Sequence, residues 1–198
     1  MTETTPPRLF LASQSPRRQE LLSQIGVTFA QIDAPIDEVR GDGEPPLDYV
    51  RRVAREKAGA GWLAVAAIPG AVVLAADTEV VLDGRVYGKP ASREEAEAML
   101  RSLSGRTHQV ISAVAVMNAG REQEAHCITT VRFAAWSESS LQRYLDSGES
   151  FGKAGAYAIQ GRAAAMIDRI EGSYSGVMGL PLFETAQLLR AFGLLTQI

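Results

Sequence analysis

Cysteine and histidine are scarce in this sequence, which has one cysteine and two histidines among its 198 residues. The single cysteine, Cys127, cannot form an internal disulfide, and it lies in a strand-like run. A lone cysteine of this kind is typical of a protein from a reducing compartment. His108 and His126 lack the cysteine or histidine companions of a zinc site, so each is expected to be structural. We therefore expect a cytoplasmic protein that needs neither a disulfide nor a structural metal to hold its core together.

A long hydrophobic run is also missing. The longest mostly apolar stretch, residues 62–76, is interrupted by Pro69 and Gly70 and is shorter than the roughly 20 residues that cross a bilayer. Residues 1–7 lack the basic start and the apolar run of a secretory signal, so they are expected to form a short disordered tail. We expect no contact with a membrane and a single domain over residues 8–198.

An excess of positive charge is absent too. Twenty basic residues stand against 23 acidic ones, which gives a formal net charge of −3. A chain without a global positive field is not expected to bind nucleic acid, and any anionic ligand must be held by a local cluster of cations. The composition, 46% hydrophobic and 22% charged, is typical of a globular protein.

Strand and helix patterns alternate along the chain, which predicts an α/β fold with helices packed on a mixed sheet. Ser92, with Glu95 three positions on, forms a capping box at the start of one helix. A strand over residues 72–76 is expected to end at Asp77. The other expected strands are 9–12, 27–32, 79–82 with 85–87, 110–116 with 129–135, 156–160 and 164–170; the expected helices are 16–24, 48–60, 93–103, one after Ser137, and 181–192.

The segment Ser13-Gln14-Ser15-Pro16-Arg17-Arg18 joins the first strand to the first helix. Unpaired backbone N–H groups and the positive end of the helix dipole favour an anion at such a helix N-terminus. The two hydroxyls and two guanidinium groups add donors that suit phosphate. On this segment alone, a capped helix with exposed arginines is the alternative.

Asp77 follows a buried strand, and open α/β sheets build their sites where strands end. An ordinary aspartate is ionised at neutral pH, so Asp77 could orient water or hold a divalent cation, although it is a poor base for free water. A bound metal ion lowers the pKa of water, which favours a joint metal and base role. Glu38 could supply a second carboxylate. The alternatives are an aspartate that caps a turn and a solvated loop acid.

Three lysines could neutralise a polyphosphate together with Arg17: Lys57 on a predicted helix, Lys89 after a predicted hairpin, and Lys153 in a glycine-rich loop. Residues 152–161 lack the glycine spacing of a P-loop and the serine or threonine that follows its lysine. Walker-type ATPase chemistry is therefore disfavoured.

Six sequence blocks together resemble the Maf family of nucleoside triphosphate pyrophosphatases, in order over residues 9 to about 192. The blocks are SQSPRR (13–18), ADT (76–78), GKP (88–90), SGRTH (104–108), KAGAYAIQG (153–161), and GSY (172–174) followed by GLPL (179–182). The resemblance implies a twisted mixed β-sheet flanked by helices, with a deep cleft, similar to the inosine triphosphate pyrophosphatases.

The same resemblance implies hydrolysis of a nucleoside triphosphate between its α and β phosphates, with Mg²⁺ or Mn²⁺ as cofactor. The KAGAYAIQG block is similar to the branch that acts on dTTP and UTP. The resemblance makes Asp77 the proton acceptor, and Arg17, Thr78 and Gln160 then bear on substrate choice. The predicted set is completed by Glu38, which would hold the metal with Asp77, and by the substrate-binding residues Ser13, Ser15, Lys57 and Lys89.

Some alternatives stay open at this point. The chain could be a non-catalytic nucleotide-binding regulator of septum formation or cell division, or a pyrophosphatase of the branch that acts on 7-methyl-GTP. A homodimer is an expectation at the family level. The amide of Gln160 matches the donor and acceptor groups of uracil and thymine, yet a flipped amide would serve cytosine equally well. The chain departs from the family pattern at Gly152, where an acidic residue is usual, and at Glu79, where an aliphatic one is usual.

Overall fold

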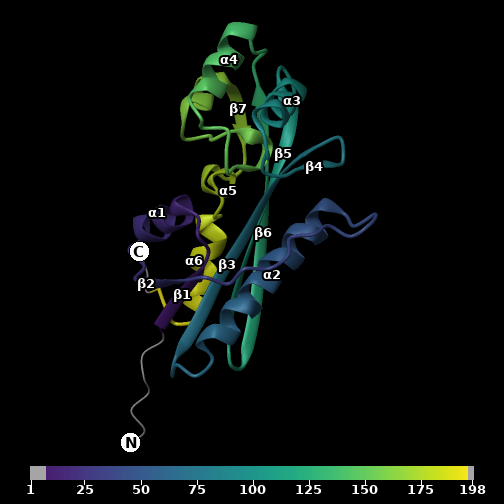
Figure 1. The fold of residues 1–198 in the computed structure, drawn as a ribbon. Coiled ribbons are helices and arrows are strands. Elements are labelled where there is room, and N and C mark those ends of the chain that lie inside the picture. Colours follow the sequence, from purple (N-terminus) through teal and green to yellow (C-terminus); the bar gives the residue numbers. More distant parts are fainter. Residues whose placement is uncertain (1–7, 196–198) are drawn as a thin grey trace, which may run out of the picture.

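The computed structural model describes residues 8–195; residues 1–7, for which a disordered tail is predicted, and residues 196–198 lie outside the described part. Strands and helices alternate in the order that the sequence predicts for most of the chain (Figure 1). The elements are β1 (Arg8–Ala12), α1 (Pro16–Gln24), β2 (Phe29–Ile32), α2 (Pro46–Val65), β3 (Ala71–Leu82), β4 (Arg85–Tyr87), α3 (Arg93–Leu103), β5 (Thr107–Asn118), β6 (Arg121–Phe133), α4 (Glu138–Asp146), the 3₁₀ helices η1 (Ala154–Ala156) and η2 (Arg162–Met166), β7 (Ile167–Glu171), α5 (Tyr174–Met178) and α6 (Leu182–Ala191).

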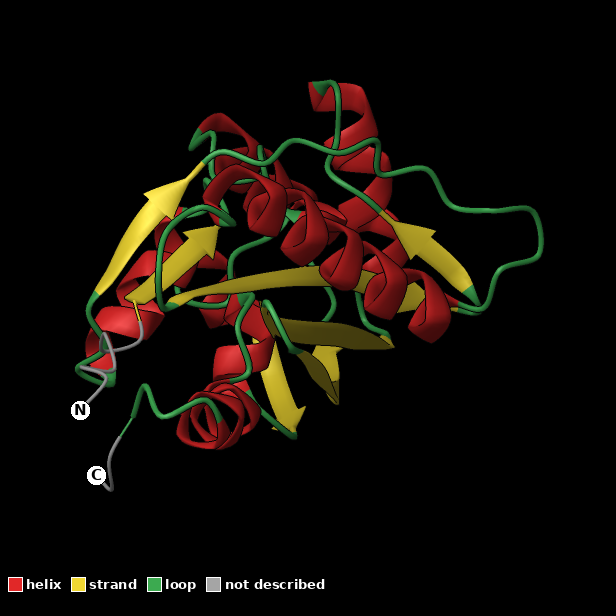
Figure 2. Cartoon of the chain, turned by 90° about the horizontal axis from the view of Figure 1, so that it is seen from below, coloured by secondary structure: helices red, strands yellow, loops and turns green. Residues whose placement is uncertain are grey.

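The strands within residues 8–195 form one seven-stranded sheet in the order β2-β1-β3-β5-β6-β7, with β4 paired to β3. β1 runs parallel to β2 and β3, whereas β3, β5, β6 and β7 pair antiparallel. Helices cover both faces of this sheet (Figure 2). The mixed sheet flanked by helices confirms the predicted fold class.

Apolar side chains hold the helices against the sheet on both faces. On one face, Val50 and Val53 of α2 pack with Val73 of β3 in a fully buried cluster. Gly61 permits this close approach, since a Cβ there would lie 2.8 Å from the Cβ of Ala12. On the other face, leucines of α1 and α6 join a cluster with apolar residues of β1, β3 and β5, and α6 lies against β5 and β6. A third cluster surrounds Phe133 beneath α3 and α4.

The structure corrects several details of the predicted elements, including the start of the strand predicted over residues 164–170, since residues 164–166 belong to η2 and β7 begins at Ile167. Asp77 is not at the end of a strand, because β3 continues without a break from Ala71 to Leu82. Residues 156–160 do not form a strand; a 3₁₀ helix and irregular backbone take their place, with Gly155 at a φ of 67°. Half of the predicted capping box is present: the Ser92 side chain accepts a hydrogen bond from the Glu95 N–H, but the Glu95 carboxylate accepts from the N–H of Ala91 rather than that of Ser92.

Among the described residues, none of the helices combines the length and the apolar character that crossing a membrane requires.

Candidate active site

The middle of β3 has an open edge. β1 pairs with β3 only as far as Leu74, and β4 begins its pairing at Val80. In the described part of the chain, the segment between these two residues has no neighbouring strand on that side. Because side chains alternate along a strand, Asp77 and Glu79 lie on one face of β3 and Thr78 lies on the other. The gap therefore brings functional groups from both faces of the sheet to one opening.

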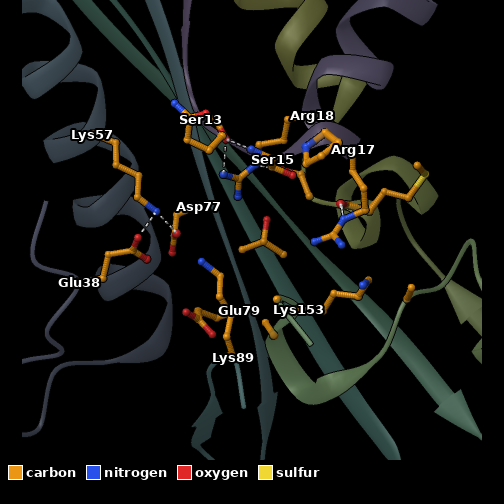
Figure 3. Close-up of a pocket in the computed structure, with 18 of the residues that line it drawn as sticks. Ser13, Ser15, Arg17, Arg18, Glu38, Lys57, Asp77, Glu79, Lys89 and Lys153 are labelled. Carbon is orange, nitrogen blue, oxygen red and sulfur yellow. Dashed lines mark hydrogen bonds and ion pairs between the residues drawn. The ribbon is translucent and has the colours of Figure 1, made fainter. Parts of the chain in front are cut away.

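Asp77 belongs to a largely buried ion-pair cluster. The Nζ atom of Lys57, on α2, lies 2.9 Å from Oδ1 of Asp77 and 2.9 Å from Oε1 of Glu38 (Figure 3). The side chain of Asp77 is 4% exposed and that of Lys57 is 13% exposed. Burial opposes the ionisation of Glu38, but the hydrogen bond and charge of Lys57, with the charges of Lys89 and Arg18, outweigh it and lower the pKa of Glu38.

Glu79 is a second buried carboxyl group beside Asp77. Burial, together with the negative charges of Asp77 and Glu38, raises the pKa of Glu79 to about 8. Its Oε2 atom receives no hydrogen bond from any residue between 8 and 195. Glu79 therefore holds a proton at neutral pH unless a cation joins the cluster.

The β1–α1 connection supplies the opposite wall. Ser15 caps α1 without a side-chain hydrogen bond, while its backbone N–H donates to Oγ of Ser13 over 3.2 Å. Arg18 donates from Nη1 to the same Oγ over 3.2 Å, and from Nε to the carbonyl of Gly179 over 2.7 Å. Arg17 donates from Nε to the carbonyl of Met178 over 3.1 Å. Arg17 uses one of its five N–H groups in these contacts and Arg18 uses two, so both guanidiniums keep N–H groups for an anion.

These groups line one cavity of about 470 Å³, which is within the size range of small-molecule sites. The acidic cluster with Lys57 and the two arginines face one another across it (Figure 3). Lys89 and Lys153 also line this cavity. Burial and the charge of Arg17 lower the pKa of Lys153. A ligand that meets all these cationic groups would carry several negative charges.

Carboxylate oxygens in this cavity suit Mg²⁺ or Mn²⁺, the cofactor that the sequence predicts. Oδ2 of Asp77 and Oε2 of Glu79 are buried, and no described residue donates a hydrogen bond to them. No group of three or more histidine, cysteine, aspartate and glutamate side chains among residues 8–195 could hold an ion alone. Mg²⁺ commonly uses one or two carboxylates together with substrate phosphates, so the residues fit an ion that binds jointly with a polyphosphate.

Every side chain predicted for the site lines this cavity. Gln160 is exposed at its rim, and Thr78 reaches it from the face of β3 opposite Asp77. Two further lining residues, Arg18 and Glu79, are not in the predicted set of site residues, although the sequence indicates Arg18 as an anion donor and Glu79 as an additional carboxylate. The two-residue period of β3 could have placed Glu79 beside Asp77. The carbonyl contacts of Arg18 come from a loop about 160 residues away, which no local pattern reveals. The individual roles of these side chains stay predictions.

The open edge of β3 in this mixed α/β sheet carries buried carboxyl groups opposite the arginine-bearing N-terminus of α1. These features define a class of protein that binds polyphosphorylated ligands. The chain belongs to the family described as Maf-like protein, whose sequence model matches residues 8–192. The predicted family resemblance is thereby confirmed.

Three relatives illustrate the likeness. A dTTP/UTP pyrophosphatase from Bordetella parapertussis is 55% identical over 195 residues, which cover 96% of this chain and 94% of that protein. A dTTP/UTP pyrophosphatase from Chromobacterium violaceum is 50% identical, with 96% and 97% covered. A nucleoside triphosphate pyrophosphatase from Xylella fastidiosa is 55% identical, with 93% and 98% covered. The structure of the Staphylococcus aureus Ham1 protein matches 93% of this chain and 97% of its own at a TM-score of 0.47 and 14% identity.

Proposed function

We propose that this protein hydrolyses nucleoside triphosphates between the α and β phosphates, with a preference for dTTP and UTP, and releases a nucleoside monophosphate and pyrophosphate. The observation that carries the proposal is the position of the buried Asp77 directly across one cavity from Arg17 and Arg18. The names of the relatives from Bordetella parapertussis and Chromobacterium violaceum support the choice of dTTP and UTP.

Cationic side chains bind the triphosphate in this proposal. The guanidinium forks of Arg17 and Arg18 and the N-terminus of α1 take phosphate oxygens on one wall. Lys89 and Lys153 compensate the remaining charge from the opening. The hydroxyls of Ser13 and Ser15 add donors at the start of α1. In this proposal the α phosphorus lies between the arginines and Asp77, which line opposite walls of the cavity.

Asp77 orients the attacking water and accepts its proton at Oδ2, the oxygen that no described residue occupies. The water oxygen forms a bond to the α phosphorus, the bond from that phosphorus to the bridging oxygen breaks, and pyrophosphate departs with the electron pair. Lys57 holds the other carboxylate oxygen at 2.9 Å, so the carboxylate keeps one orientation while it accepts the proton.

Asp77 and Glu38 are the residues that would hold the divalent ion, with the carboxyl of Glu79 beside them. The ion, when bound, neutralises phosphate charge and makes the water more acidic. Glu79 would release its proton as the cation arrives, because its pKa is raised by burial and by the two neighbouring carboxylates. Gln160 at the rim would meet the base through its amide.

A panel of triphosphates tests the proposal. The purified protein is incubated with dTTP, UTP, CTP, GTP, ATP and 7-methyl-GTP in the presence of Mg²⁺ or Mn²⁺, and pyrophosphate and monophosphate are quantified. The expected result is stoichiometric pyrophosphate and monophosphate from dTTP and UTP. Nucleotide binding without turnover would overturn the proposal in favour of a regulator, and a strong preference for 7-methyl-GTP would place the chain in the other branch.

A further inference from the structure

A buried hydrogen-bond chain leads from the cavity into the core of the protein. The hydroxyl of Thr78 lies 2.7 Å from the hydroxyl of Ser112, its cross-strand neighbour on β5. Ser112 is fully buried, and its Oγ donates over 2.6 Å to the backbone carbonyl of Gly176 on α5. Thr78 is half-buried whereas the other residues of β3 are buried, and it lines the cavity, so the hydrogen-bond chain has its outer end there.

Counting protons fixes the direction of every bond in this chain. A serine hydroxyl has one proton, and a carbonyl oxygen can only accept, so the proton of Ser112 is committed to Gly176. The bond between the two hydroxyls must then be donated by Thr78. Its own proton therefore points away from the cavity, and Oγ1 of Thr78 presents only lone pairs to a ligand.

The Gly176 end of this hydrogen-bond chain is fixed by further contacts in the core. Oγ of Ser173 accepts the N–H of Gly176 over 3.0 Å, and the Gly176 carbonyl also accepts the N–H of Gly179 over 3.0 Å. A Cβ at Gly176 would lie 2.5 Å from Sγ of Cys127, so only glycine allows α5 to pack this close to the sheet. The acceptor that takes the Ser112 proton is thus a fixed part of the core.

An acceptor-only hydroxyl selects which part of a nucleotide it can meet. Phosphate oxygens are themselves acceptors and are repelled by the lone pairs of Thr78. The side chain also projects from the face of β3 opposite Asp77 and Glu79, away from the acids that would orient water. The partner of Thr78 is therefore an N–H or O–H group of the nucleoside. Both a deoxyribonucleotide and a ribonucleotide appear in the names of the relatives, which argues against the 2′-hydroxyl and for the base.

We propose that Ser112 acts as a positioning residue that fixes Thr78 as an acceptor for the N3–H of uracil or thymine. This inference rests on the proposed function. Cytosine has a lone pair at N3, so its triphosphate would bring two acceptors together and leave both without a proton. Such an unpaired contact in a desolvated site discriminates strongly between bases. Gln160, whose amide can turn, does not need to carry this discrimination alone.

The decisive comparison is the ratio of kcat/KM for UTP to that for CTP. In Ser112→Ala, the Thr78 hydroxyl can rotate and donate to the cytosine N3, so the ratio should fall about tenfold or more, with the change mostly in KM. Thr78→Ser keeps a hydroxyl within reach of Ser112 and should preserve the ratio. Ser150→Ala, a fully buried serine outside the cavity, is the matched control and should also leave the ratio unchanged.

N3-methyl-UTP on the wild-type protein tests the same inference without a variant that could fail to fold. It lacks the imino proton and should be a much poorer substrate than UTP, whereas dUTP should remain a good one. An unchanged ratio in Ser112→Ala, equal turnover of UTP and CTP by the wild type, or normal turnover of N3-methyl-UTP would each overturn the role of Ser112. Absence of pyrophosphate from every triphosphate would instead overturn the proposed function itself.

Discussion

The Nζ atom of Lys57 bridges Asp77 and Glu38 at 2.9 Å from each carboxylate. Lys57 and Asp77 are both largely buried, so each depends on the other to offset its loss of hydration. The lysine thereby keeps Asp77 in place in the wall of the cavity. Stability and the proposed catalysis are coupled at this contact.

Replacement of Lys57 by methionine should destabilise the protein. Lys57→Met preserves the apolar stem and leaves Asp77 buried without a counter-charge, which should lower the free energy of unfolding by about 3 kcal/mol in urea denaturation. The double variant Lys57→Met with Asp77→Asn should lose clearly less than the sum of the two single changes, because the unpaired charge is gone. Strict additivity would show that the two side chains do not stabilise one another.

His108 should make the protein sensitive to acid. Burial lowers the pKa of His108 to about 4, and its Nε2 atom lies 2.8 Å from the hydroxyl of Tyr157. The unfolded chain takes up a proton near pH 6.5 while the folded protein does not, so stability should fall as pH drops from about 6.5 to about 4, by at most about 1.4 kcal/mol per pH unit. His108→Gln should lack this part of the pH dependence in chemical denaturation. The exposed His126 is the control: if His126→Gln has the same effect, burial is not the cause.

Substitutions of Gly152 and Gly155, just before and within η1, allow the cost of backbone strain to be measured separately from the cost of a steric clash. Gly152 and Gly155 have φ values of 69° and 67°, but a Cβ at Gly155 would lie 2.8 Å from Cγ2 of Val80, whereas none of the described atoms lies within 4 Å of a Cβ at Gly152. Gly152→Ala should cost about 1 kcal/mol, and Gly155→Ala should cost at least about 1 kcal/mol more. Thermal denaturation measures the difference. Equal costs would mean that the contact with Val80 does not constrain this loop.

The alternation of patterns was sufficient to predict most of the fold. The Ser92 cap, the glycine stops and the apolar spacing are local signals, so α1, α3 and the β5–β6 hairpin follow from them. The predicted strand over residues 156–160 is wrong: Gly155 and Ala156 have positive φ values, and Gly155 donates its N–H to the carbonyl of Gly88. A hydrogen bond of this kind joins segments that are far apart in the sequence, so it produces no periodic residue pattern that could predict it.

The sequence was sufficient to predict which residues belong to the candidate site, but not how these residues are arranged in space. The sequence indicates Asp77, Lys57 and Arg17 as charged residues at turns and on a helix, but it does not show that they share a cavity. The open edge of β3 depends on where β1 ends relative to β4, which is a property of strand register. The chain from Thr78 through Ser112 to Gly176 likewise joins three elements, and no single motif contains it.

The most direct test of the account is pyrophosphate release from UTP by Asp77→Asn. The amide has the same shape but cannot accept the proton of the attacking water, so kcat should fall by at least about a hundredfold in a protein that is still folded by circular dichroism and still binds nucleotide. Asp83→Asn, at an exposed turn of the β3–β4 hairpin, is the matched control and should retain full activity. An Asp77→Asn protein that releases pyrophosphate at the wild-type rate would contradict the central role of Asp77.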